Sequence, residues 1–102
     1  MEVVTIKRGD TRTAPDIDLL TPGGNAVNLH GATVRFVMMK GLMALIDKEA
    51  TIIDEEGGRV AYFFEDGETE LTGSMKAWFK VTYPDSRRET FPNEDYIIIK
   101  FE

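Results

Sequence analysis

Hydrophobic and polar residues alternate through the C-terminal third of the chain, which is the pattern of β-strands with one face toward water. Between Met75 and Tyr83 every odd position is apolar or aromatic, whereas the even positions are mostly polar. The proline and aspartate at 84–85 suit the central positions of a tight turn. After this turn the chain runs back in two further segments with a strand pattern, from Arg87 to Phe91 and from Tyr96 to Phe101. The pattern therefore predicts antiparallel strands that meet near the C-terminus.

The rest of the chain carries shorter strand patterns between turn signals, at Thr21 to Asn25, Gly41 to Met43 and Asp54 to Gly58. No window keeps a long helical period, and only Asp66 to Thr72 is compatible with a single helical turn. We therefore expect one all-β domain over residues 1–102, an antiparallel sandwich of about seven to eight strands. The further expected strands are Val3 to Lys7, Asp16 to Leu20, Ala26 to Leu29, Thr33 to Lys40, Ala44 to Asp54 in one or two pieces, and Arg59 to Glu65.

Charge and composition argue against several classes of protein. The 102 residues carry a net charge of −6, so a nucleic-acid backbone and an anionic membrane would both be repelled. The chain has no cysteine, which removes disulfides and thiolate chemistry, and His30 is its only histidine. No nucleophile motif, signal peptide or apolar run of roughly 20 residues is present. We expect neither an enzyme nor a cofactor, metal, nucleic-acid or membrane partner.

An ordered set of segments resembles the N-terminal domain of the baseplate upper protein (BppU) of tailed bacteriophages. The set covers essentially the whole chain, from Val3 to Phe101, and no single piece of it is specific alone. The segments are Gly9-Asp10-Thr11, Asn28 to Met38, Ala50 to Asp54, Gly58 to Tyr62, Ala77 to Asp85, and Thr90 to Ile97.

This resemblance implies an immunoglobulin-like β-sandwich that serves as a structural docking module in the phage tail or baseplate, without catalysis. It also implies other tail or baseplate proteins as partners, with assembly in the host cytoplasm and a final place in the virion. Family members are usually longer, so a chain ending at Glu102 also allows a neck or decoration subunit. Ring-shaped virion structures further suggest a homo-oligomer, because a closed ring repeats one heterologous contact.

Trp78 is the foremost candidate for an interface, since strand alternation places it on the face opposite Phe79. It lies between Lys76 and Lys80, and its neighbour on the next strand is expected to be Tyr96 or Ile98. Together these side chains would form an exposed apolar patch of the kind that marks an interface. The alternative is that a loop of the same chain covers Trp78.

Other candidates have simpler structural explanations. Val37 and Met39 should also face outward, although a strand covered on both faces would account for them better than a partner surface. The acidic groups Asp54 to Glu56 and Glu65 to Glu70 lack the spacing of a calcium loop, which favours solvated turns. A carbohydrate-binding or cell-surface-binding sandwich, with Trp78, Tyr96 or Tyr62 stacking on sugar rings, is the rival function.

Overall fold

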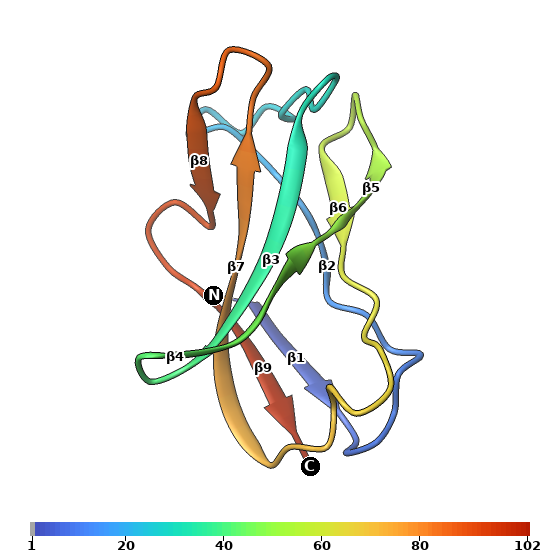
Figure 1. Cartoon of the computed structure of the whole chain (residues 1–102). Coiled ribbons are helices and arrows are strands. Elements are labelled where there is room, and N and C mark those ends of the chain that lie inside the picture. Colours follow the sequence, from blue (N-terminus) through green and yellow to red (C-terminus); the bar gives the residue numbers. More distant parts are fainter. Residues whose placement is uncertain (1) are drawn as a thin grey trace.

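The computed structural model describes residues 2–102, which form two β-sheets packed face to face with no helix among them (Figure 1). This confirms the predicted all-β sandwich. The strands are β1 (Glu2–Ile6), β2 (Asp16–Asp18), β3 (Thr33–Lys40), β4 (Met43–Glu49), β5 (Thr51–Asp54), β6 (Arg59–Ala61), β7 (Gly73–Thr82), β8 (Arg88–Phe91) and β9 (Ile97–Phe101).

The larger sheet has the strand order β1-β9-β7-β3-β4, with β8 also pairing with β7. Strand β7 is its longest element and pairs with β9 along its first half and with β8 along its second half. The reversal between β7 and β8 is the predicted turn, because the Ser86 amide donates to the Tyr83 carbonyl at 2.9 Å across residues 84–85. The pairing of β1 with β9 is parallel, whereas the expectation was antiparallel throughout.

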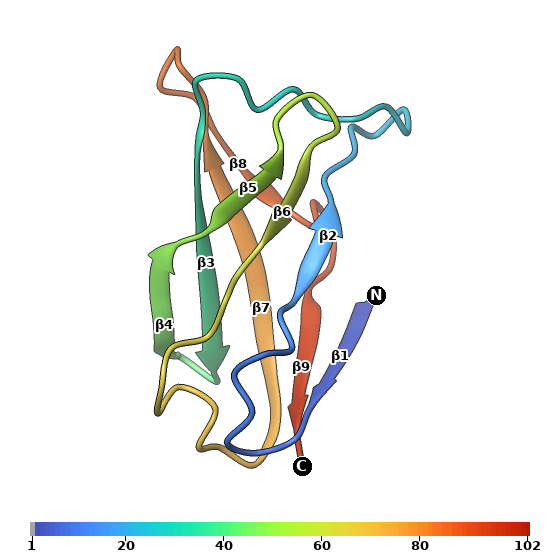
Figure 2. The same cartoon turned by 90° about the vertical axis from the view of Figure 1, so that its right-hand side faces the viewer.

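The smaller sheet has the order β2-β6-β5 and covers one face of the larger sheet, as Figures 1 and 2 show from two directions. Its β5-β6 hairpin turns at the predicted glycine pair. Gly58 has φ +68°, and a Cβ there would lie 2.7 Å from the Val27 carbonyl oxygen and 2.8 Å from that of Leu19. Glycine is therefore required for the hairpin to pack this closely.

The core lies between the sheets and follows the predicted alternation. The odd positions of β7, from Met75 to Val81, are at most 2% exposed. Phe36 of β3 stacks on Tyr62 with a 4.6 Å centroid separation and meets Phe79 at 5.2 Å. Because Tyr62 directly follows β6, this aromatic contact joins the two sheets across the core.

Three local expectations were wrong. The strand expected from Arg59 to Glu65 ends at Ala61, because Ala61 already pairs with the first residues of β2 and β5 and neither partner extends further. Ala26 to Leu29 forms only a single bridge, with the amides of Val27 and Leu29 bonded to different segments. No helical turn occurs between residues 66 and 72; residues 66–69 form a turn, where the Glu68 carboxylate accepts the Glu65 amide at 2.7 Å.

Candidate functional site

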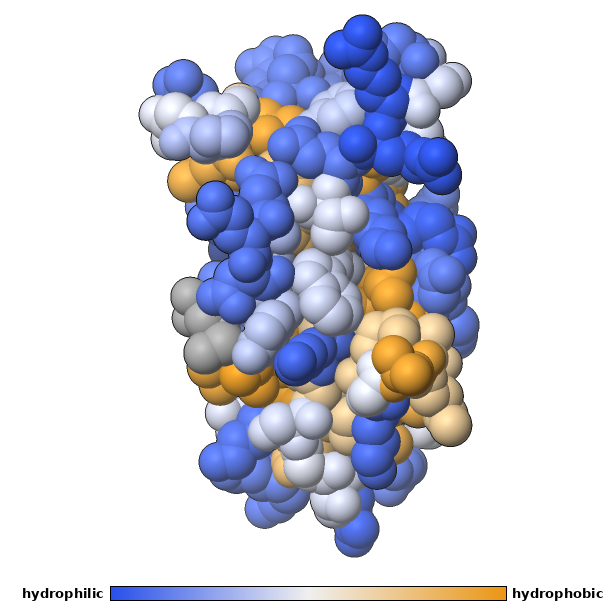
Figure 3. All heavy atoms as spheres, turned by 90° about the vertical axis from the view of Figure 1, so that its left-hand side faces the viewer, coloured by the Kyte–Doolittle hydropathy of each residue, from blue (hydrophilic) through white to orange (hydrophobic). Residues whose placement is uncertain are grey.

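The outer face of the larger sheet brings together the side chains that the sequence analysis named as an interface candidate, with further apolar residues beside them. Register places Trp78 of β7 directly opposite Val37 of β3, both pointing away from the core. Tyr96 precedes β9 and meets the Trp78 ring edge-on, with centroids 6.3 Å apart. Ile98 of β9 pairs with Val3 of β1, the next strand of the sheet. We call these five residues and Met39 the outer patch; Figure 3 looks onto this face.

Trp78 is half-buried. Its ring lies outside the core, as alternation predicts, yet the loop before β9 contacts it. The indole N–H donates to the Asp95 carbonyl oxygen at 3.0 Å. This bond fixes the ring orientation and satisfies its only polar group.

Two lysines flank the outer patch, as expected from their even positions on β7. Lys76 places its ammonium 4.5 Å from the Tyr96 ring centroid, a cation-π geometry. Its cross-strand neighbours are Ile98 and Met39, whereas Lys80 lies opposite Thr90 of β8. The neighbour of Trp78 is thus Tyr96, while Ile98 is the neighbour of Lys76.

Val37 is buried at 7% exposure, which agrees with the expectation that a central strand is covered on both faces. Met39 is only partly covered. Beside them the tip of the β3-β4 hairpin carries Leu42, whose side chain is fully exposed. A shallow hollow of about 390 Å³ lies between this tip, Trp78 and Lys80. The hairpin tip therefore extends the apolar surface beyond the outer patch.

The strands of this face carry mostly positive charge, opposite in sign to the chain. Their outward positions hold five cations and two carboxylates. One carboxylate, Asp47, is already paired with Arg35 at 2.8 Å. The cations are Arg35, Lys76, Lys80, Arg88 and Lys100, and the carboxylates are Asp47 and Glu49.

Acidic residues gather instead around the smaller sheet, and several of them have structural partners. Arg59 of β6 donates to Asp18 at 2.9 Å and to Asp16 at 2.7 Å, and these two hydrogen bonds raise the pKa of its guanidinium. Asp16 and Asp18 are both exposed. In the fold they bracket one arginine across the β2-β6 pair.

Glu68 is the centre of a second polar cluster. Its carboxylate lies 3.0 Å from the Lys48 ammonium and accepts the Tyr62 hydroxyl at 2.8 Å. Burial of Glu68 favours its neutral form, but hydrogen bonds from Glu65 N–H, Lys48 and Tyr62 outweigh it, so the pKa of Glu68 lies below its ordinary value. Part of the acidic run interpreted as solvated turn is therefore structural.

Alternation located the outer patch but not its extension at Leu42 or its edge at Val3. The available signal was the apolar pair Leu42 and Met43 inside a turn, where polar residues are usual. Across residues 2–102 no group of three His, Cys, Asp or Glu side chains is placed to hold a metal ion, and no helix suits a membrane span. His30 sits in a turn, 3.0 Å from Glu55.

Comparison with known proteins gives a family for this architecture. A solved structure of the N-terminal domain of phage TP901-1 ORF48 superimposes with a TM-score of 0.68 at 17% identity, covering 98% of this chain and 84% of that one. No curated protein sequence matches. The model of the BppU N-terminal domain family matches residues 2–95. The chain therefore belongs to the family of BppU N-terminal domains, which are structural domains of the phage baseplate.

Proposed function

We propose that this domain acts by docking onto other baseplate or tail proteins through the outer patch. The observation that carries the proposal is the position of Trp78 and Tyr96 outside the core, beside exposed apolar side chains. Val3 is 55% exposed and Leu42 is fully exposed. Burial of large apolar groups of this kind is the main driving force of protein association.

The charge of the outer face adds a preference for an acidic partner surface. Two copies joined through the same face would oppose Lys76 and Lys80 with their own equivalents, which costs energy. A heterologous contact avoids this clash and can be repeated around a ring. The acidic side of the smaller sheet, with Glu55 and Asp66 exposed, makes a second copy one suitable partner beside other baseplate proteins.

The test measures binding between the purified domain and the purified tail and baseplate proteins of the same phage. Truncation of Trp78 to alanine should weaken the complex by about 2–4 kcal/mol, because a central tryptophan contributes most strongly to an interface. Phe63→Ala is the matched control, since Phe63 is 52% exposed but lies outside the outer patch. Equal weakening of the complex by Trp78→Ala and Phe63→Ala would contradict the proposal, as would the absence of binding between the unaltered domain and every tail and baseplate protein.

Carbohydrate or cell-surface binding is the second candidate, because the Trp78 ring is partly open on the outer face. A sugar ring stacked on this indole could not use its N–H, which is already bonded to Asp95. Glycan-array binding that disappears in Trp78→Ala would favour this function over docking.

A further inference from the structure

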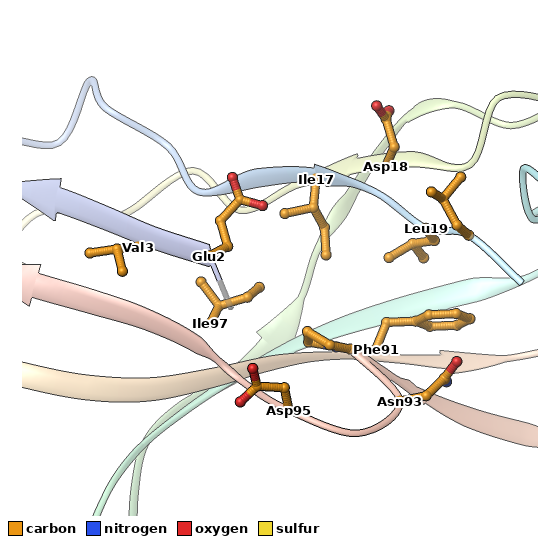
Figure 4. A pocket seen from close by; sticks show the side chains of 11 residues that line it. Glu2, Val3, Ile17, Asp18, Leu19, Phe91, Asn93, Asp95 and Ile97 are labelled. Carbon is orange, nitrogen blue, oxygen red and sulfur yellow. The ribbon is translucent and has the colours of Figure 1, made fainter. Parts of the chain in front are cut away.

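A second hollow lies on the open side of the sandwich and borders the outer patch at Val3. It has a volume of about 720 Å³ and separates β2 of the smaller sheet from β1 and the β8-β9 connection of the larger sheet. Figure 4 shows Ile17 and Leu19 on one wall, with Phe91 and Ile97 on the other. The two sheets are therefore not closed against each other along this side.

Strand β2 presents an open backbone edge to this cleft. Among residues 2–102 it pairs only with β6. The bonds from Tyr62 N to Pro15 O and from Leu19 N to Gly58 O show that the backbone groups of its odd residues face β6. Because backbone groups alternate in direction along a strand, the amides and carbonyls of Asp16 and Asp18 face the other way. Such an edge is a template for one more strand.

The side chains around the edge define what an added strand must carry. On the core side the lining is apolar, with Ile17 and Leu19 from β2 facing Phe91 and Ile97. Leu20 at the lip is 47% exposed. A strand beside β2 would point every second residue onto this apolar lining, as alternation requires.

On the opposite side of β2 the side chains are acidic. Asp16 and Asp18 point outward and already hold Arg59 from the neighbouring strand. At the cleft itself Glu2 and Asp18 contribute carboxylates, and the lining that the structure describes includes no lysine or arginine. The outward positions of an added strand would therefore favour cations.

We propose that this cleft receives an extended segment of a partner protein, which pairs with the free edge of β2 and alternates apolar with basic residues. The apolar residues fill the cleft over Phe91 and Ile97, and the basic residues lie beside Asp16 and Asp18. Among the described residues that line this site, Val3 also belongs to the outer patch, and none belongs to β7.

The probe is a short capped peptide of alternating valine and lysine, titrated into the whole domain with ¹⁵N labelling. The expected result is saturable amide shifts at Asp16, Asp18 and Leu20. A matched peptide with glutamate in place of lysine should bind at least about tenfold more weakly, because it opposes the carboxylates. Shifts confined to Trp78 and Tyr96, equal binding of both peptides, or no shift would each overturn the proposal.

Peptide backbone methylation separates strand pairing from simple charge attraction. In a bound peptide strand, the amides of every second residue face β2 and the remaining amides face away. Methylation of the first set removes the donors to β2, whereas methylation of the second set leaves those donors intact. Methylation of the set that faces β2 should abolish binding and methylation of the other set should retain it; equal effects would overturn the strand geometry.

In the protein, Asp18→Asn should weaken binding of the lysine peptide about fivefold. The control Asp66→Asn removes an exposed turn carboxylate and should leave this binding unchanged.

Discussion

The two faces of β7 carry different kinds of side chain, and core packing explains only those of the inner face. On the inner face Met75, Ala77, Phe79 and Val81 are almost completely buried between the sheets. On the outer face the same strand carries lysines and a half-buried tryptophan. The inner residues are explained by the core alone, whereas an aromatic residue outside it is not needed to close the sandwich. This excess of apolar surface is what a docking partner would use.

The strongest test of this comparison is removal of an inner side chain. Phe79→Ala should lower the free energy of unfolding by about 3–5 kcal/mol, because it leaves a cavity beside Phe36. Denaturant unfolding followed by circular dichroism measures the change. A loss below about 1 kcal/mol would show that the inner face is not the core that holds the sheets together.

The matching outer variant, Trp78→Ala, should cost only about 1–2 kcal/mol in the same measurement. The ring is half-buried and gives up one hydrogen bond, from its N–H to the Asp95 carbonyl. A cost equal to that of Phe79→Ala would place the indole functionally within the core and remove the reason to assign it to an interface.

Glu68→Gln tests the polar cluster beside the smaller sheet through its pH dependence. Because the folded pKa of Glu68 lies below its ordinary value of 4.5, its stabilisation is present above that value and is lost as pH falls through the folded pKa. At neutral pH the variant should be less stable by about 1 kcal/mol. The difference from the parent protein should shrink in acid, measured by thermal unfolding across pH; a constant difference would exclude the ion pair with Lys48.

The smallest effect is expected at Thr69, which is fully buried with no hydrogen-bond partner for its hydroxyl among the described residues. Thr69→Val keeps the shape and removes an unsatisfied polar atom, so stability should stay equal or rise by up to about 1 kcal/mol. Thr69→Ser is the control, since it keeps the hydroxyl and loses the methyl group. A clear loss in the valine variant would reveal a hydrogen bond to that hydroxyl.

Local patterns predicted much of this molecule. Strand β3 begins and ends where alternation places it, at Thr33 and Lys40. The turn at residues 84–85 and the outward position of Trp78 also follow from the sequence, because side-chain direction and turn geometry depend on neighbours in the chain.

Contacts between distant segments were decided only by the tertiary structure. Nothing local indicates that β1 pairs in parallel with β9, that Ala61 ends β6, or that Glu68 meets Lys48. The cleft beside β2 arises in the same way, since the described residues that line it come from the N-terminal part of the chain, up to Leu20, and from the C-terminal part, from Phe91 to Ile97. Periodicity determines which face of a strand is apolar, but pairing partners depend on packing between segments far apart in sequence, which no window of residues contains.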